Sequence, residues 1–219
     1  MGSSLSRPQL RRLYDRTGQR QDTLAFYSGP AFDVLCSCVD WGQVQSMIEL
    51  GCGTGRLAER LLRDYLPDDA RYLGLDLSGR MATLARDRLS TFGPRAAVQQ
   101  TDGRLSFAQE SGSQDCVMAT YVLDLLSSSD IRDVLAEAHR VLHSSGRLVL
   151  AGLTWGEEPI ARLVSTIWYG LYSVRPTWVG GCRPVDVRRV LVDARWHVRH
   201  HEVVQAWGIP SEIVIAEPR

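Results

Sequence analysis

The chain has 219 residues, of which 44% are hydrophobic and 23% charged, and its 25 basic residues balance its 25 acidic ones. This length and composition predict one globular domain. A neutral chain is poorly suited to non-specific nucleic-acid binding, because that affinity comes mainly from neutralised phosphates.

All 25 basic residues are arginine, and the sequence contains neither lysine nor asparagine. The absence of lysine excludes Schiff-base chemistry and a Walker-type phosphate-binding lysine. Five cysteines occur without any CxxC pair, so the sequence predicts reduced thiols in a cytoplasmic protein and no bound metal. These cysteines are Cys36, Cys38, Cys52, Cys116 and Cys182.

The sequence contains no apolar run long enough to span a membrane, and its first residues lack the apolar core of a signal peptide. Residues 1–6 match the short pattern for myristoylation of Gly2, although a pattern of this length leaves lipidation open.

Residues 1–45 are rich in arginine and contain short helical stretches, which we interpret as a helical lid segment. Strand and helix patterns then alternate five times between residues 46 and 153, as in a doubly wound α/β sheet. Two further helices are expected near 157–174 and 185–194. The strands expected at 196–206 and 212–216 would form an antiparallel hairpin. The prediction is therefore an α/β fold with a seven-stranded, mostly parallel sheet over residues 46–219.

A glycine-rich loop, Gly51-Cys52-Gly53-Thr54-Gly55, follows the first strand and precedes a helix. Glycines allow a tight turn and close approach to a ligand, and the free N–H groups of a helix N-terminus attract an anion. The third glycine comes one residue earlier than in a dinucleotide-binding loop. The spacing therefore favours a small anion, such as an amino-acid carboxylate, over a pyrophosphate.

Residues 49–55, read ELGCGTG, resemble the first motif of class I S-adenosylmethionine-dependent methyltransferases. Asp76 follows Gly55 by 21 residues at the end of the second strand. Residues 114–126 resemble the fourth-strand region of the ubiquinone/menaquinone-type, or type 11, small-molecule group. The resemblance implies a Rossmann-like fold and S-adenosylmethionine as cofactor, with S-adenosylhomocysteine as product.

The resemblance also implies a set of cofactor-binding residues. Asp76 would bind the ribose hydroxyls and Asp102 the adenine amino group. The whole implied set is Glu49, Gly51, Cys52, Gly53, Gly55, Asp76, Leu77, Asp102, Gly103, Thr120 and Tyr121. Some have simpler interpretations: the glycines could serve a turn, Asp76 could cap the next helix, and Asp102-Gly103 is a common turn sequence.

Methyl transfer requires no dedicated nucleophile, because the cofactor supplies the electrophile. The catalytic candidates are Asp124 as a general base after the fourth strand and Tyr14 in the lid segment. Asp124 could equally cap the turn at 127–130. We expect solvated or structural roles for the five histidines, which are His139, His143, His197, His200 and His201.

Residues 155–183 form an insert between the fifth strand and the next helix. Apolar residues recur in this insert at helical spacing and predict a stripe that docks on the core. They are Ile160, Leu163, Val164, Ile167, Trp168 and Leu171. Ala161, Tyr169 and Tyr172 would extend this sector to one side, and Trp178 follows in the next loop. Together they would roof an apolar acceptor pocket, with Arg162 and Arg175 at its mouth. The alternative is that these aromatic residues only seal the insert to the body of the protein.

The function expected from the sequence is methyl transfer to a small, hydrophobic or aromatic acceptor. Residues 119–122 lack the Asn/Asp-Pro-Pro-aromatic motif of enzymes that methylate nucleobase amino groups, so nucleic acid is not an expected partner. A monomer or a homodimer fits equally well. A non-catalytic S-adenosylmethionine-binding protein and an NAD-dependent oxidoreductase are the alternative interpretations.

Overall fold

The structure is a computed structural model that describes residues 4–24, 26–192 and 195–219. Its helices are α1 (Arg7–Thr17), α2 (Gln21–Leu24), α3 (Ser28–Cys38), α4 (Arg56–Asp64), α5 (Gly79–Leu89), α6 (Ser128–Val141), α7 (Pro159–Val174) and α8 (Val187–Val192). Its strands are β1 (Ser46–Leu50), β2 (Arg71–Asp76), β3 (Ala96–Gln100), β4 (Gln114–Thr120), β5 (Leu142–Leu153), β6 (Trp196–Ala206) and β7 (Ile209–Pro218). Gly2 of the myristoylation pattern lies outside the described residues.

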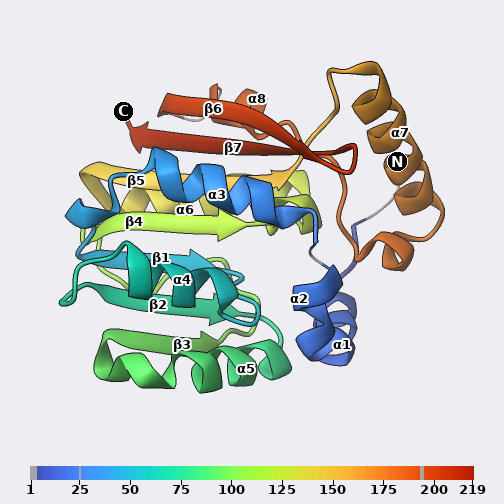
Figure 1. The fold of residues 1–219 in the computed structure, drawn as a ribbon. Coiled ribbons are helices and arrows are strands. Elements are labelled where there is room, and N and C mark those ends of the chain that lie inside the picture. The colour runs from blue at the N-terminus through green and yellow to red at the C-terminus, as the bar shows by residue number, and fades with distance from the viewer. Residues whose placement is uncertain (1–3, 25, 193–194) are drawn as a thin grey trace.

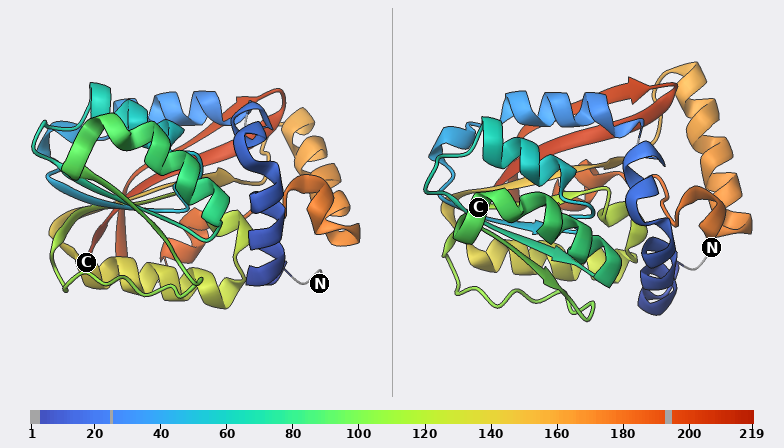
Figure 2. Two further views of the ribbon diagram at one scale, coloured as in Figure 1. Left: turned by 90° about the horizontal axis from the view of Figure 1, so that it is seen from below. Right: turned by 60° about the horizontal axis from the view of Figure 1, so that its bottom comes forward.

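The seven strands form one sheet in the order β3-β2-β1-β4-β5-β7-β6. The first five strands are parallel, and β7 lies antiparallel to both β5 and β6. This confirms the predicted mostly parallel sheet with an antiparallel hairpin at its end. The crossover connections place helices on both faces of the sheet (Figures 1 and 2).

Two apolar cores hold the helices on the sheet. On one face α3, α4 and α5 bury side chains such as Leu35, Leu61 and Ala85. On the other face α6 and α8 bury side chains such as Leu135 and Leu191. Strands β1, β4 and β5 contribute residues to both cores, which explains their nearly continuous apolar sequences.

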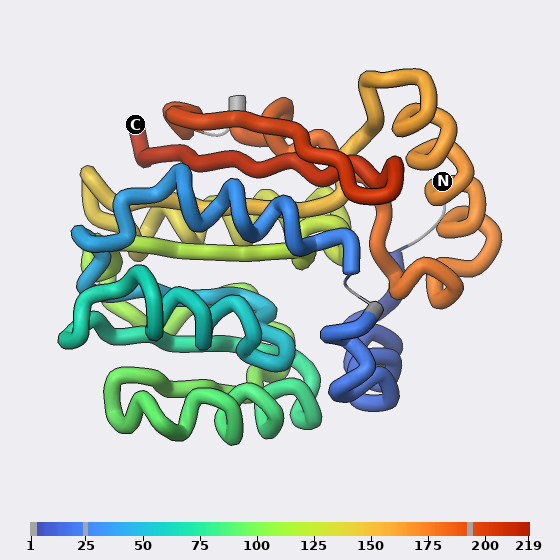
Figure 3. The backbone as a smooth tube through the Cα atoms, viewed as in Figure 1, coloured from blue at the N-terminus to red at the C-terminus, as the bar shows by residue number. Residues whose placement is uncertain are grey.

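The N-terminal helices α1 and α2 and the insert helix α7 all lie at the carboxyl ends of the parallel strands, as Figure 1 shows. The tube in Figure 3 shows the turn between β6 and β7 beside α7 at the same end. A ligand of an open α/β sheet binds at this edge. The extra segments of this chain therefore surround the place where a site is expected.

The docking face predicted for α7 is wrong for four of its six residues. Val164 and Trp168 pack against a small apolar cluster around Leu153, but the other four are exposed. Ile160, Leu163 and Ile167 are 72%, 61% and 54% exposed, whereas Ala161, Ser165 and Tyr172 are buried. The loop before α7 covers part of the buried side of the helix. A Cβ on Gly156 would overlap the backbone of Ala161, and the Gly156 N–H donates to the Ser165 hydroxyl.

Candidate active site

A cavity opens at the carboxyl ends of β1, β2 and β4 and extends beneath α1 and α2. Nine of the predicted cofactor-binding residues line it: Glu49, Gly51, Cys52, Gly53, Asp76, Leu77, Gly103, Thr120 and Tyr121. The predicted sites on four separate loops therefore meet in one space.

The glycine loop is held by the next strand. The N–H groups of Gly51 and Cys52 both donate to the Leu75 carbonyl oxygen, at 2.7 and 3.1 Å. Gly51 has a φ of 71° and Gly53 a φ of 54°, a region that favours glycine. Gly53 lines the cavity, and a Cβ there would meet no protein atom within 4 Å. The loop thus leaves open space where a ligand can approach the backbone.

Gly55 has a different role from the one the resemblance implies. It does not line the cavity but precedes α4, and a Cβ on it would lie 3.2 Å from the Cα of Ala85. The third glycine therefore allows α4 and α5 to pack closely.

Asp76 braces the loop. Its carboxylate accepts hydrogen bonds from the N–H of Gly53 and of Ser78, both at 2.8 Å. Burial raises the pKa of Asp76 to about 6, although the two backbone bonds act in the opposite direction. The capping role that we considered for Asp76 belongs to Ser78, whose hydroxyl accepts from the N–H of Met81.

Glu49 is a buried carboxyl group in the cavity wall. Its Oε2 accepts a hydrogen bond from the Tyr72 hydroxyl at 2.5 Å. Burial raises its pKa to about 7, and the nearby Asp76 adds to the shift. A buried acid without a cationic partner favours its neutral form, so this position suits a positively charged ligand group.

Asp102 lies outside the cavity lining, unlike its neighbour Gly103. Its carboxylate accepts from the N–H of Arg104 and forms an ion pair with the Arg104 side chain, where it is 65% exposed. This matches the turn interpretation of Asp102, and its contact with an adenine amino group stays a prediction.

The lid segment is fastened to the cavity rim by three carboxylates. Asp15 accepts from the Ser78 hydroxyl at 2.6 Å, and Asp22 accepts from the Thr54 hydroxyl and from Arg88. Asp130 on α6 forms an ion pair with Arg7 of the lid. These contacts hold the N-terminal segment against the glycine loop and the start of α5.

One part of the cavity wall is aromatic. Tyr27 and Phe32 both meet the Tyr121 ring edge-on, with centroids 5.4 and 6.0 Å apart. The Tyr121 hydroxyl donates to Ser211, and Tyr121 has the positive φ of 55° that is rare for a non-glycine residue. Leu10, Leu125, Leu126 and Cys182 also line the cavity.

Tyr14 of α1 also lines the cavity, and its catalytic role stays a prediction. Its hydroxyl donates to the Gly180 carbonyl at 3.3 Å and lies 4.0 Å from the Cys182 sulfur. Burial raises the Tyr14 pKa well above its usual value, and the thiol of Cys182 and the carboxyl of Asp124 add to the shift. Tyr14 is therefore protonated and can donate or accept a hydrogen bond.

Asp124 is buried behind the cavity wall rather than in its lining. Its Oδ2 accepts from the Leu153 N–H at 3.4 Å, and its Oδ1 has no hydrogen-bond partner. Burial raises its pKa to about 7. The capping role weighed for Asp124 is taken by Ser127, which accepts from the Asp130 N–H.

The three predicted acceptor-binding residues lie away from this cavity. Tyr172 is buried with its ring stacked at 6.1 Å on Tyr169, and Trp178 is 59% exposed. Of the insert at 155–183, which the structure describes throughout, Cys182 alone lines the cavity. The sequence missed Phe32 and Cys182 because each joins the site only through the fold.

Comparison with known proteins agrees with this geometry. Residues 47–146 match the family described as the methyltransferase domain. The chain is therefore similar to methyltransferase domains over the segment that begins in β1 and ends in β5. This segment includes the strands β1, β2 and β4, at whose carboxyl ends the cavity opens.

Two curated relatives illustrate the similarity. A malonyl-[acyl-carrier protein] O-methyltransferase of Marinomonas is 28% identical over 163 residues, which are 74% of this chain and 57% of the relative. A demethylmenaquinone methyltransferase of Tropheryma whipplei is 27% identical over 147 residues, which are 65% of this chain and 58% of the relative. The chain spans 34% to 66% of the length of the curated relatives that it matches.

Among solved structures, the [4+2]-cyclase SpnF superposes with a TM-score of 0.76 at 15% sequence identity. The superposition covers 99% of this chain and 98% of the cyclase. At this identity the likeness shows a shared fold. The shared fold therefore extends from α1 through the β6–β7 hairpin.

Proposed function

We propose that the protein transfers a methyl group from S-adenosylmethionine to a small, hydrophobic or aromatic acceptor. The observation that carries the proposal is a single cavity with two chemically different parts in its wall. One part holds the glycine loop, Glu49 and Asp76, and the other holds an aromatic cluster around Tyr121.

The residues of the first part fit the cofactor. Glu49 would neutralise a positive group, and Asp76 would accept bonds from ribose hydroxyls with the lone pairs that the Gly53 and Ser78 amides leave free. The open space at Gly53 would admit the cofactor beside the backbone. When bound, the cofactor supplies an electrophilic methyl group.

The second part supports an apolar acceptor. Tyr27, Phe32 and Tyr121 offer ring edges and faces, and Leu125 and Cys182 fill the remaining wall. A pocket of this kind binds a ligand mainly through apolar contact, with a few polar groups to orient it. The hydroxyl of Tyr14 is the group that we assign to orient the acceptor. The same arrangement supports a small molecule over nucleic acid as the partner.

A general base is needed only if the acceptor loses a proton. Asp124 stays our candidate because burial holds its pKa near 7 and it acts electrostatically on Tyr14. Since Asp124 lies behind the lining, we propose that it acts through the groups in front of it.

All five cysteines are free thiols, which supports a reducing, cytoplasmic compartment as the place of action. No helix among the described residues is long and apolar enough to cross a membrane.

Calorimetric titration with S-adenosylhomocysteine tests the cofactor assignment. We expect Asp76→Ala to weaken binding at least about tenfold, since bonds to a charged acceptor contribute roughly 1.5–3 kcal/mol each. Asp69→Ala, at an exposed position outside the cavity lining, is the matched control and should bind as the wild type does. Equal affinity in wild type and Asp76→Ala would contradict the ribose assignment.

Turnover tests the acceptor. The protein is incubated with methyl-labelled S-adenosylmethionine and three pools: apolar metabolites, bulk tRNA and carrier-protein thioesters. We expect label in the apolar pool, and Cys182→Phe should abolish it while cofactor affinity is retained. Label in the tRNA pool would overturn the acceptor class. Tight cofactor binding without label in any pool would favour the alternative of a non-catalytic binding protein.

A further inference from the structure

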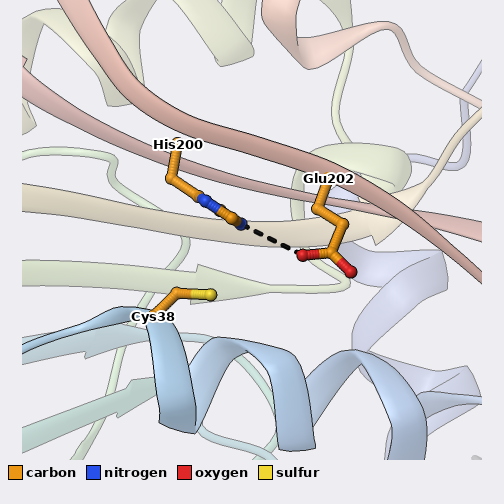
Figure 4. A group of neighbouring side chains, drawn as sticks. All are labelled: Cys38, His200 and Glu202. Atoms are coloured by element: carbon orange, nitrogen blue, oxygen red, sulfur yellow. Dashed lines mark ion pairs between the residues drawn. The ribbon is translucent and has the colours of Figure 1, made fainter.

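Three side chains with metal-binding atoms meet on the edge of the sheet, away from the cavity. Cys38 is the last residue of α3, and His200 and Glu202 lie on the edge strand β6. Figure 4 shows the imidazole and the carboxylate pointing from the strand toward the helix, with the thiol opposite them. None of the three lines the cavity.

A β-bulge creates this arrangement. The pairing of β6 with β7 shifts between Val198 and His200, so Arg199 is an additional residue in the strand. Before the bulge, Trp196 and Val198 face the core beneath α6 and α8. After it, Val204 faces the core beneath α3, and His200 and Glu202 share that face because they follow the same alternation. The bulge therefore turns both side chains toward Cys38.

The ligand atoms are spaced as a zinc ion requires. The Nε2 of His200 and the Oε2 of Glu202 are 3.4 Å apart, and all three ligand atoms lie within 4.8 Å of one another. Two ligands of a tetrahedral zinc, at about 2.0–2.2 Å from the metal, are separated by about 3.3–3.4 Å. The thiolate needs to move by only about 1 Å to complete the set, since a bound sulfur lies about 3.5 Å from the other ligands.

The surroundings of the imidazole nitrogen also suit a metal ion. Its Nε2 is shielded from solvent and has no hydrogen-bond partner, although Glu202 is near enough for an ion pair. A buried nitrogen without a hydrogen bond is costly unless something else occupies its lone pair or proton. A metal ion at the centre of the cluster would do so.

We propose that Cys38, His200 and Glu202 form a zinc site. The combination of one thiolate, one imidazole and one carboxylate matches the ligand preference of Zn²⁺ and differs from the oxygen-only sets of Mg²⁺ and Ca²⁺. Cys38 is exposed and Glu202 is 45% exposed, so water can take the fourth position. The metal would fasten the end of α3 to the edge strand.

The sequence predicted no metal because Cys38 stands 162 positions before His200. The three ligands therefore form no short metal-binding motif in the sequence. The site does not depend on the proposed methyl transfer. Its test therefore uses metal binding and thiol protection rather than activity.

Tag-free protein is titrated with Co²⁺ as a spectroscopic probe for the zinc position, and then with Zn²⁺. We expect one Co²⁺ per chain, a thiolate-to-cobalt band in the near ultraviolet, and displacement of the band by Zn²⁺. Zinc should also slow the reaction of Cys38 with a thiol reagent at least about tenfold. Cys38 is the one exposed thiol among five cysteines that the structure describes, so the protection can be assigned.

Cys38→Ser should remove the band, and His200→Ala should lower the cobalt affinity at least about tenfold. His197→Ala is the matched control, because His197 is an exposed histidine on the same strand before the bulge. Circular dichroism confirms that each variant is folded. A wild-type protein without the band, or a band that survives Cys38→Ser, would overturn the proposal. An affinity lowered equally by His197→Ala would do the same.

Discussion

Asp22 accepts a 2.5 Å hydrogen bond from the Thr54 hydroxyl, which joins the lid segment to the glycine loop. Arg88 donates to the other carboxylate oxygen of Asp22 and also to the Thr54 oxygen. Burial opposes the ionisation of Asp22, but these hydrogen bonds outweigh it and lower the Asp22 pKa. The lid segment is thus held by a residue of the loop that would contact the cofactor.

We predict that Asp22→Ala opens the lid and speeds the release of S-adenosylmethionine. The free energy of unfolding should fall by about 1–2 kcal/mol, because a charge-assisted pair with partial exposure is lost. Stopped-flow dissociation measures the release rate. Asp64→Ala is the control, since Asp64 forms an exposed ion pair with Arg63 outside the lid segment. Equal release rates in both variants would show that the contact does not hold the lid.

The buried carboxyls in the cavity predict that cofactor affinity depends on pH. The pKa of Glu49 is about 7 and that of Asp76 about 6, so both groups carry protons in mildly acidic solution. A cationic ligand favours the ionised carboxylates and lowers both pKa values. Binding therefore releases protons, and affinity should rise between pH 5.5 and pH 8.

Calorimetry in buffers of different ionisation enthalpy measures that proton release. Glu49→Gln should bind more weakly at pH 8 and show a flatter pH profile, because it has no proton to lose. A wild-type affinity that stays constant over this pH range would contradict the placement of a cation beside Glu49.

The parallel part of the sheet was predictable because each buried strand ends at a local signal. Residues 46–50 run into the glycine loop, and the second strand ends at Asp76, so sequence order alone placed both acids at one edge. The predicted cofactor-binding residues are close in sequence to the ends of these strands. Because the strand ends meet at one edge of the sheet, most of these residues line one cavity.

The parts that sequence reasoning did not predict depend on contacts between distant segments. Periodicity identified α7 as a helix, but its buried face depends on packing against Cys182 and Ile209, which are distant in the sequence. The meeting of Cys38 with His200 depends on a bulge at Arg199, and strand alternation alone would have placed His200 on the opposite face. Cys182 reaches the cavity only because the insert returns past Tyr14.

Asp124 offers a prediction about stability. Its folded pKa of about 7 lies above the value of about 4 in an unfolded chain. The folded state therefore holds a proton that the unfolded state loses, and the stability from the neutral carboxyl is fully present below pH 4. That stability is lost as pH rises through 7. Asp124→Asn has no charge to bury. The difference in melting temperature between this variant and the wild type should therefore favour the variant more at pH 8 than at pH 5.

The same variant tests Asp124 as a base. If it removes a proton from the acceptor, Asp124→Asn should lower kcat about 100-fold while leaving the affinity for S-adenosylmethionine unchanged. Differential scanning fluorimetry and steady-state turnover provide the two readouts. A variant that gains stability at pH 8 and keeps full turnover would leave Asp124 with a structural role.

The exposed stripe on α7 predicts unusual tolerance to polar substitution. Leu163 and Ile167 are more than half exposed, so the double variant Leu163→Gln and Ile167→Gln should change the free energy of unfolding by about 0.5 kcal/mol or less. Ala161→Gln is the contrasting control, because Ala161 is fully buried against Gly156 and a longer side chain cannot fit. Chemical denaturation measures both. A loss of several kcal/mol in the double variant would show that the stripe is packed in solution.

The hairpin turn predicts a stabilising substitution. Trp207 and Gly208 both have positive φ, 57° and 77°, as a two-residue turn between β6 and β7 requires. Glycine adopts this conformation readily, but a tryptophan pays about 1 kcal/mol or more for it, and asparagine is favoured there. The Trp207 side chain is 84% exposed, so little packing compensates.

Trp207→Asn should therefore raise the free energy of unfolding by about 1 kcal/mol in urea denaturation. Trp155→Asn, an exposed tryptophan outside the turn, controls for the loss of apolar surface. A lower stability for Trp207→Asn would show that the indole makes contacts in solution that outweigh the strained backbone.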